Sequence, residues 1–460
     1  MGRHATQLAP IQMLRPQNDL ALHRGVIFSF TTASWASGQG PSRRLFRRYS
    51  RISVDHPPEL RQYGLMFKRS LNIRPLLERK SLFLLGPRLT GKSTNLRENF
   101  PEAHVVDLLE SGLFRDLLQS PQRLGEIVEL RRKEASVFVI DEVQKIPTLL
   151  NEVHRLIEKD KKLRFILTGS SARKLRRSGV NLLGGRAAQV HFHPITFPEL
   201  ATERKRRRSW EDCLSIGALP SVLDSDDPVS DLRDYVGLYL REEVQAEGLT
   251  RSIEAFSRFL DVAALMCGKQ LNFTAIGSDA QVPPRTVIDY FGILQDTLVG
   301  SLLPAFVKTP KRKAMTSAKF YFFDVGVAGS LLGRNAVKEG TEEYGKALEH
   351  YVFTQIKAYL DYHMIDLSLS YWRSLSKFEV DFVLPLSKSG KALKAIGIEV
   401  KATRNPGERA LHGLRALAED VALERKIVVA PVASSYQTKD GIEVLHPEDF
   451  LAVLWSGRLV

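Results

Sequence analysis

The chain has 460 residues, a length that allows about three or four domains, and an excess of Lys and Arg gives it a formal net charge of +14. The positive charge favours a polyanionic partner, above all a nucleic acid such as DNA, and the alternative is a merely basic cytosolic protein. Two cysteines are too few for a disulfide framework or a Cys-based zinc site, and no apolar run approaches the ~18 residues of a membrane span, so we expect a cytoplasmic protein without a membrane partner.

Residues 1–65 lack the pattern of a domain. They contain nine Arg, no Lys and three acidic residues, with no sustained apolar period, which predicts a disordered leader. An acid-poor leader with Arg and Ser is also typical of an organellar transit peptide. We favour a third interpretation, a start site placed too far upstream with Met66 as the natural beginning, because Lys first appears at Lys68.

From Met66 onward the pattern is α/β, and its first predicted strand, 81–85, leads into a P-loop at 86–93. The two glycines of the motif let the backbone turn and aim its N–H groups at phosphate oxygens, and the helix that follows adds partial positive charge. Lys92 is spaced to reach the β- and γ-phosphates of ATP, and the Ser93 hydroxyl to ligate Mg²⁺. The predicted nucleotide-binding residues of this motif are Gly86, Arg88, Gly91, Lys92, Ser93 and Thr94.

The second half of a nucleotide site follows at 137–142, where four apolar β-formers precede two acids. This pattern predicts a buried parallel strand that delivers carboxylates at its C-terminal edge, where ligands bind in open α/β sheets. We expect Asp141 to hold Mg²⁺ through water and Glu142 to orient or deprotonate the attacking water. The acidic strand disfavours the alternative that the Gly-rich turn at 86–93 arises by chance.

Further elements complete this first domain. Strands are predicted at 104–108, 163–171 and 188–192, and a helix at 149–159. Thr168 or Ser170, at the end of one strand, is a candidate γ-phosphate sensor, and a polar strand-end turn is the alternative. His191 and His193 alternate with Phe192, and we interpret them as strand-face residues because no acid or Cys cluster accompanies them.

Four of these segments together resemble a known family. They are Gly-Pro-Arg-x-x-Gly-Lys-Ser-Thr (86–94), Ile-Asp-Glu-Val-Gln-Lys-Ile-Pro (140–147), Leu-Thr-Gly-Ser-Ser-Ala (167–172) and Leu-x-Gly-Gly-Arg (182–186). They resemble one group of prokaryotic AAA-superfamily P-loop ATPases, which carry a C-terminal domain of unknown function with a restriction-endonuclease-like fold. The resemblance runs from about Met66 to the C-terminus. It implies ATPase activity, self-association through the ATPase core, and a role for Arg186 as a trans-acting finger or sensor. The family usually has Thr at the position of Ser93, and either hydroxyl binds Mg²⁺.

A helical lid is predicted at 201–250. The basic run at 204–208 is either a solvated linker or a contact to a phosphate backbone. Gly217 and Pro220 resemble the family's Gly-x-x-Pro element at the start of the lid, and helices are predicted at 231–245 and 253–267.

A winged helix is predicted at 251–335. The segments 273–277 and 282–291 have helix–turn–helix spacing, with Pro at the first turn of the second helix, and a β-like stretch at 298–306 follows. Arg285 and the basic wing at 308–313 are placed to contact DNA, and a winged helix used for protein packing is the alternative.

The last predicted domain, 336–460, has the order α-β-β-β-α-β. A helix is expected at 345–360 and 408–423, and strands at 371–373, 378–384, 395–401 and 426–430. Strand periodicity puts Glu379 and Asp381 on one face, and likewise Glu399 and Lys401.

An Asp on one strand and Glu-x-Lys on its neighbour resemble the core of metal-dependent nucleases. The resemblance implies that Asp381 and Glu399 chelate Mg²⁺, that Glu349 completes the metal shell and that Lys401 activates the attacking water. Val380 stands where a Pro is often found. The alternative is an inherited fold whose carboxylates no longer cut.

Together these patterns predict an α/β protein with a P-loop NTPase core of parallel sheet at 66–200, a helical lid, a winged helix and a restriction-endonuclease-like domain. The predicted function is ATP-dependent, Mg²⁺-dependent coupling of nucleotide state to nucleic-acid binding, with metal-dependent DNA cleavage as a possible addition. The alternative is a non-cutting nucleotide switch or scaffold that binds a protein partner.

Overall fold

The computed structural model describes residues 67–171, 183–202, 208–240, 252–306, 318–374, 376–386 and 394–460. The chain divides into two units, Met1–Gln62 and Tyr63–Val460, and every described residue lies in the second. The predicted leader, most of the basic run at 204–208 and the wing lysines lie outside the described residues. Among the described helices, none is both long and apolar enough to cross a membrane.

The first part of the described chain is a five-stranded parallel sheet with the strand order β2-β3-β4-β1-β5. Its strands are β1 (Ser81–Leu85), β2 (His104–Asp107), β3 (Val137–Asp141), β4 (Arg164–Gly169) and β5 (Ala187–His191). Its helices are α1 (Arg74–Arg79), α2 (Lys92–Asn99), α3 (Ser111–Gln119), α4 (Arg123–Arg131) and α5 (Leu149–Lys159), with a 3₁₀ turn η3 (Val143–Lys145). The strands predicted for this part are confirmed to within two residues at each end.

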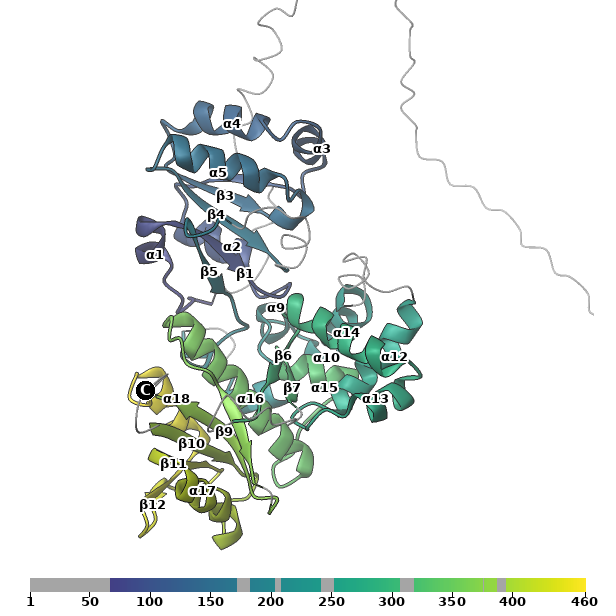
Figure 1. Ribbon diagram of the computed structural model, residues 1–460, viewed down its shortest axis with the longest axis vertical. Coiled ribbons are helices and arrows are strands. Elements are labelled where there is room, and N and C mark those ends of the chain that lie inside the picture. The colour runs from purple at the N-terminus through teal and green to yellow at the C-terminus, as the bar shows by residue number, and fades with distance from the viewer. Residues whose placement is uncertain are drawn as a thin grey trace, which may run out of the picture. The chain divides into compact units, whose positions relative to one another are not determined.

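Helices cover both faces of this sheet, which is why its strands are continuous apolar runs. In β1, Leu82 and Leu84 pack in a cluster with side chains of α1 and α2. Phe83 and Leu85 point the other way and pack in a cluster with α3, α4 and α5. Figure 1 shows α4 and α5 over that second face. The sheet is thereby held rigidly, and the loops at its C-terminal edge are held with it.

Short helices follow the sheet. They are α7 (Phe197–Leu200), α8 (Trp210–Ile216), α9 (Pro220–Leu223), α10 (Pro228–Asp234) and a π-helical segment η4 (Tyr235–Leu240). The prediction of a helix starting at residue 231 is wrong by three residues. The Asp227 carboxylate caps the helix by accepting from the Ser230 N–H at 3.1 Å, and Pro228 occupies the first turn, so both set an earlier start.

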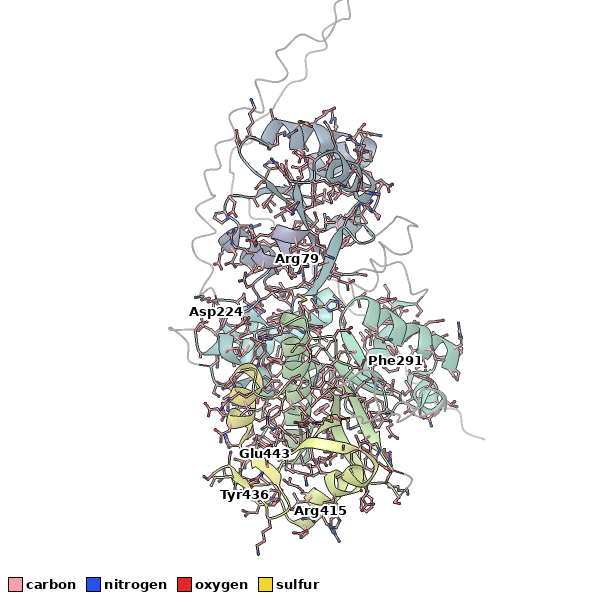
Figure 2. The ribbon with its side chains drawn as sticks, turned by 60° about the vertical axis from the view of Figure 1, so that its left-hand side comes forward. Arg79, Asp224, Phe291, Arg415, Tyr436 and Glu443 are labelled. Carbon is pink, nitrogen blue, oxygen red and sulfur yellow. The ribbon has the colours of Figure 1, made fainter. Side chains whose placement is uncertain are left out.

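Three helices and a hairpin come next, in the order expected of a winged helix. They are α12 (Ile253–Leu265), α13 (Phe273–Ala280), α14 (Pro284–Asp296), β6 (Gly300–Leu303) and β7 (Lys319–Phe322), followed by α15 (Val325–Leu331). Val287, Tyr290, Phe291 and Leu294 of α14 are buried. Phe291, labelled in Figure 2, makes edge-to-face ring contacts with Phe259 and Phe320. The interpretation as a winged helix stays a prediction, because nothing described here establishes its binding role.

The C-terminal part is a six-stranded mixed sheet with the order β12-β13-β11-β10-β9-β8. Its elements are α16 (Glu342–Tyr362), β8 (Ser370–Arg373), β9 (Glu379–Pro385), β10 (Lys394–Val400), α17 (Glu408–Asp420), β11 (Ala422–Val429), β12 (Tyr436–Gln437), β13 (Ile442–Leu445) and α18 (Pro447–Trp455). The predicted order α-β-β-β-α-β is confirmed as far as β11, and the last two strands and α18 were not predicted.

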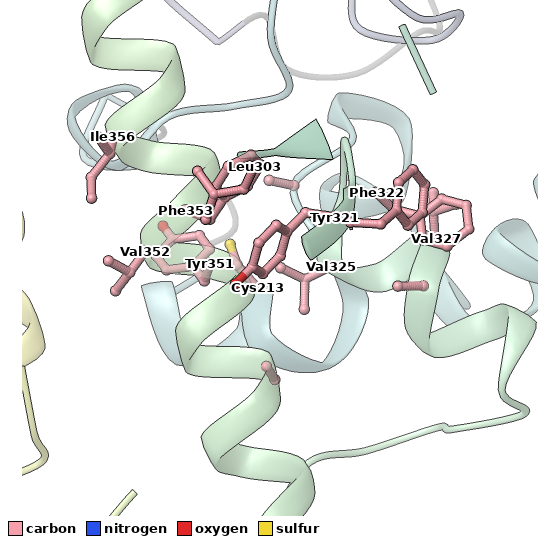
Figure 3. Close-up of a cluster of buried hydrophobic side chains, with 14 of the residues drawn as sticks. Cys213, Leu303, Tyr321, Phe322, Val325, Val327, Tyr351, Val352, Phe353 and Ile356 are labelled. Carbon is pink, nitrogen blue, oxygen red and sulfur yellow. The ribbon is translucent and has the colours of Figure 1, made fainter. Parts of the chain in front are cut away.

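One face of this sheet packs against α17 and the other against α16 and α18. The second of these cores draws buried side chains from Phe67 to Leu459, and those of α8, the hairpin and α16 are among them. Figure 3 shows part of this core, where Tyr321 of β7 lies against Phe353 of α16 with ring centroids 4.2 Å apart. The predicted border at 335/336 therefore falls inside one packed core.

Candidate functional site

The P-loop has the backbone that its glycines predict. It connects β1 to α2, and Gly91 takes a left-handed conformation with φ of +89° immediately before the helix begins. A Cβ on Gly86 would overlap the carbonyl oxygen of Phe192, the residue after β5. Both positions therefore require glycine, one for its dihedral angles and the other for the close approach of a neighbouring strand.

Lys92 is buried in the first turn of α2, and its ammonium lies over the loop. Its Nζ donates to the carbonyl oxygens of Gly86 and Pro87 at 2.8 and 2.9 Å. Both carbonyls belong to the P-loop itself. The Lys92 ammonium is therefore close to the place where the phosphates of a nucleotide would be bound. The geometry fits the expected role of Lys92 as a point charge for a nucleotide.

Ser93 and Asp141 meet at the C-terminal edge of the sheet. The Ser93 hydroxyl donates to Asp141 Oδ2 at 2.8 Å, and the Thr168 hydroxyl donates to Asp141 Oδ1. A hydroxyl and a carboxylate held together beside a phosphate loop are hard oxygen donors of the kind that Mg²⁺ takes alongside phosphates and water. The donor set therefore fits a nucleotide-bound Mg²⁺. Thr168 also accepts from the Glu142 N–H at 3.1 Å, and its sensor role stays a prediction.

Sequence reasoning missed Gln144, which holds the Glu142 carboxylate. Gln144 Nε2 donates to Glu142 Oε2 at 2.6 Å and to Ser170 Oγ at 3.3 Å. Glu142 itself has a φ of +61°, an uncommon left-handed conformation for a residue with a side chain. The turn and the amide thus fix the direction of the carboxylate. The only available signal was the polar Gln two positions after Glu142.

Arg186 is not brought to the nucleotide loop of its own chain. It immediately precedes β5, whose Ala187 pairs with Ser81 at the start of β1, whereas the P-loop follows the far end of β1. Five strand residues at ~3.3 Å each separate the two edges by roughly 16 Å. Arg186 instead forms an ion pair with Glu158 on α5. Of the other predicted loop residues, Arg88 is half-buried and Thr94 is exposed on α2.

A second group of predicted residues meets on the C-terminal sheet, around a lysine that the sequence analysis did not single out. Lys319 of β7 is only 4% exposed, and its Nζ lies 3.2 Å from Glu349 Oε1, 2.7 Å from Glu379 Oε1 and 3.5 Å from Asp381 Oδ1. Although burial opposes the charged form, the carboxylates of Glu349, Asp381 and Glu379 hold the pKa of Lys319 above its ordinary value. We call these four residues, with Glu399 and Lys401, the acidic centre.

The remaining members of the acidic centre also have protein partners. The Lys401 ammonium donates to Glu399 Oε1, and Asp381 Oδ2 accepts from the Val400 N–H at 2.8 Å. Burial and the charge of Asp381 raise the pKa of Glu349 and of Glu399. Within the described residues, no group of three or more His, Cys, Asp or Glu is arranged to hold a metal ion. The structure places Glu349 and Asp381 around Lys319 and pairs Glu399 with Lys401. The metal-ligand roles of Glu349, Asp381 and Glu399 and the catalytic role of Lys401 stay predictions.

A buried arginine connects the P-loop to α16. Arg69 donates to the Thr90 carbonyl at 2.7 Å, forms an ion pair with Glu199 at 3.0 Å, and donates to the Tyr362 hydroxyl at 3.0 Å. Next to it, His193 Nε2 lies 2.6 Å from Asp361 Oδ2. The prediction of His193 as a strand-face residue is wrong, because β5 ends at His191 and His193 lies in the segment that follows it. We call Arg69, Glu199 and Tyr362 the Arg69 junction.

The predicted lid and DNA contacts are described only in part. Gly217 has φ of +74°, and a Cβ there would collide with the Asp324 carboxylate, which explains the glycine in the Gly-x-x-Pro element. Arg285 is 83% exposed on α14, with Asp289 3.9 Å away. The rest of the proposed DNA surface, the wing at 308–313, is outside the described residues.

Comparison with known families identifies the class of domain in the first part of the chain. Residues 78–201 match a family model described as an AAA domain. Residues 207–338 and 344–450 match two models described as domains of unknown function, DUF8612 and DUF4143. The match supports an AAA-type P-loop ATPase, in agreement with the class expected from the motifs. The restriction-endonuclease-like nature of the last domain stays a prediction.

Individual relatives are distant. An uncharacterized protein of Haemophilus influenzae is 21% identical over 339 residues, which is 69% of this chain and 78% of that protein. Domain III of the Thermotoga maritima replication initiation protein DnaA is 19% identical, with 28% of this chain and 61% of that chain covered and a TM-score of 0.21. Replication initiator DnaA bound to AMPPCP and single-stranded DNA is 13% identical, covers 50% of this chain and 90% of its own, and has a TM-score of 0.22. At these TM-scores neither structure bears on the function of this chain.

Proposed function

We propose that the chain binds and hydrolyses ATP at the P-loop and couples its nucleotide state to binding of a nucleic acid. The observation that carries the first half is the 2.8 Å bond between Ser93 and Asp141 beside the loop, with Glu142 as the next residue. A hydroxyl and two carboxylates thereby stand at one sheet edge. This is the set that phosphoryl transfer to water requires.

Each residue then has a defined task. Lys92 and the loop N–H groups bind the phosphates, and Gln144 holds Glu142 so that this carboxylate can accept a hydrogen bond from the attacking water. Mg²⁺ bound with the nucleotide would be held by Ser93 and, through water, by Asp141, and it supplies neutralisation of phosphate charge. Arg186 is too far along the sheet to act in its own chain. We therefore propose that Arg186 acts on a nucleotide bound by a second copy, through the self-association of ATPase cores that the family resemblance implies.

The test of ATP hydrolysis compares two variants. Lys92→Ala should lose ATP binding measured by calorimetry, because the point charge at the loop is removed. Glu142→Gln should keep binding and lower kcat by about 10²-fold or more, since the water loses its orienting carboxylate. Glu126→Gln, an exposed Glu on α4, is the control and should match the parent. Equal turnover in Glu142→Gln and the parent would reject the proposed role.

The nucleic-acid half rests on the charge of +14 and on exposed Arg285 at the start of α14. The same ATPase assay is therefore run with and without DNA at two salt concentrations. Stimulation by DNA that weakens at the higher salt supports the coupling, because phosphate contacts release counterions. If DNA does not change ATP turnover, the proposed coupling to nucleic acid is rejected, and the proposal of ATP hydrolysis is unaffected.

The non-cutting alternative is the second candidate, and the acidic centre favours it. Lys319 occupies the space among the carboxylates, and Lys401 is committed to Glu399. We therefore propose that the C-terminal domain binds a partner without cleaving it. The absence of DNA or RNA cleavage in Mg²⁺ and in Mn²⁺ supports this candidate, and cleavage that Lys401→Ala abolishes contradicts it.

A further inference from the structure

The acidic centre contains a cation of its own, and this cation comes from another part of the chain. Lys319 is the first residue of β7, within the residues that match one family of unknown function, whereas its acidic partners belong to the match that follows. Its ammonium contacts Glu349, Glu379 and Asp381 within 3.5 Å, and it lies 5.5 Å from the centroid of the Tyr371 ring. One side chain thus contacts α16, β9 and β8.

Charge balance explains why a cation is needed there. Glu349, Glu379, Asp381 and Glu399 bring four carboxylates close together, and like charges at such separations repel strongly when they are removed from water. Lys319, beside Glu349, Glu379 and Asp381, and Lys401, beside Glu399, offset part of this repulsion. In a metal-dependent nuclease, a divalent cation would offset the repulsion among these carboxylates. Here such a cation does not fit, because the buried Lys319 ammonium already contacts three of them.

The ligand positions are also taken. Asp381 Oδ2 accepts from the Val400 N–H at 2.8 Å, and Glu349 Oε1 accepts from the Tyr321 hydroxyl at 2.5 Å. Mg²⁺ needs near-octahedral oxygen ligands at about 2.1 Å, and each of these two hydrogen bonds competes with such a ligand bond at one carboxylate oxygen. Among the described residues only Glu399 Oε2 is a buried carboxylate oxygen without a hydrogen-bond partner.

The backbone of β7 holds Lys319 in this place. The strand pairs with β6, where Leu303 lies opposite Lys319, and Lys319 forms a further bridge with Gln270. Two residues on, Tyr321 stacks on Phe353 of α16 (Figure 3). Its hydroxyl donates to Glu349 Oε1. The ammonium is therefore delivered by a fixed strand and not by a surface loop.

We infer that Lys319 is the resident cation of the acidic centre, where it replaces a divalent metal ion and joins the β6–β7 hairpin to the C-terminal sheet. The centre is then a metal-independent joint between two parts of the chain, and a divalent ion enters only when the ammonium is removed. The inference goes beyond ATP hydrolysis and is independent of it, since it concerns no residue of the P-loop.

The experiment uses the full chain without nucleotide, so that the P-loop does not bind Mg²⁺ through phosphates. Mn²⁺ and Mg²⁺ are added to the parent, to Lys319→Ser and to Lys319→Ser/Asp381→Asn, and the melting temperature and Mn²⁺ affinity are measured. The matched control is Lys394→Ser, which removes an exposed Lys paired with Glu424 on the same sheet. The melting temperature of the parent and of the Lys394→Ser control should not rise when Mn²⁺ or Mg²⁺ is added. Lys319→Ser should melt lower than the parent and regain on the order of 2 °C or more with Mn²⁺, and the added Asp381→Asn should abolish the gain.

Two results overturn the inference. One is a Mn²⁺ response of the parent that Asp381→Asn removes, because a metal then shares the centre with Lys319. The other is a folded Lys319→Ser that gains no Mn²⁺ affinity. Should Lys319→Ser fail to fold, the comparison is made between the parent and Asp381→Asn. The same change of melting temperature with Mn²⁺ in both proteins supports the inference, and a change in the parent only refutes it.

Discussion

Asp324 is a carboxylate buried where α15 begins, and both of its oxygens accept backbone hydrogen bonds. Oδ1 accepts from the Val327 N–H at 3.0 Å and Oδ2 from the Ala218 N–H at 2.7 Å. Burial raises its pKa to about 6, against an ordinary value of 3.8, and the backbone donors only partly counteract this. The Asp324 carboxylate thereby connects the turn at Gly217 to the segment after the hairpin. Because this carboxylate titrates, we expect the stability of the connection to depend on pH.

The sign of this pH dependence follows from linkage. Because the pKa of Asp324 is higher in the folded state, the folded chain binds the proton more tightly, and stability is lost as pH rises from about 4 to about 6. The protonation of Asp324 contributes about 3 kcal/mol to the unfolding free energy at low pH, and this contribution is lost at pH 7. The difference in unfolding free energy between the parent and Asp324→Asn should shift by this amount against the parent between pH 4 and 7, measured by urea titration at each pH. Asp420→Asn, which changes an exposed Asp at the end of α17, is the control variant for the same measurement.

Residue-level chemistry was predictable where it depends on local spacing. The two P-loop glycines, Lys92 and the acids after β3 stand in fixed sequence motifs, and the structure brings them to one sheet edge. Gln144 was missed because its importance comes from a hydrogen bond to Glu142 that only the turn at Glu142 makes possible. Lys319 was missed for the same kind of reason, since its partners lie 30 to 62 positions further along the chain.

At the scale of elements, α17 packs so closely on β9 that one position allows no side chain. A Cβ on Gly413 would overlap the carbonyl oxygen of Glu379, a member of the acidic centre. The strand and helix patterns predicted β9, β10, α16 and α17. Strict alternation does not hold along β9, because its register against β8 shifts and Val380 and Val383 pack on one face while Phe382 and Leu384 pack on the other. The patterns did not predict β13 and α18, because four-residue strands contain too few alternations to be distinguished from a loop.

Substitution at this contact has a measurable cost. Gly413→Ala should lower the unfolding free energy by about 1–3 kcal/mol, because the helix must move off the strand. Gly292→Ala, inside α14, is the control, since nothing lies within 4 Å of its added Cβ. The measurement is chemical unfolding followed by circular dichroism. Equal stability of the two variants would contradict the close packing of α17 on β9.

At the scale of the whole described chain, the Arg69 junction is the contact between the nucleotide loop and α16. The sequence predicted the succession of domains in order, but not the core that α8, the hairpin and α16 share, because local patterns do not say which apolar faces meet. For the same reason the sequence did not predict that Arg69, before the first strand, would contact Tyr362.

Tyr362→Phe tests this contact with the loss of a single oxygen. The variant should bind ATP normally, since Arg69 keeps its bond to the Thr90 carbonyl. Protection of α16 amides from hydrogen exchange on adding a non-hydrolysable ATP analogue should be weaker than in the parent. Tyr436→Phe, at an exposed tyrosine of β12 (Figure 2), is the control. If α16 responds to the nucleotide equally in both variants, the junction does not transmit the nucleotide state.

The length of α16 has a mechanical consequence. Glu349 and Tyr362 are 13 positions apart on this one helix, which separates them by ~20 Å along its axis. Such a helix acts as a lever: a tilt of about 5° around its Tyr362 end displaces Glu349 by roughly 1.7 Å, by the same geometry. An ion pair of 3.2 Å between Lys319 and Glu349 does not survive a displacement of that size unchanged. A small change at the nucleotide loop would therefore be magnified into the gain or loss of a charge contact at the far end.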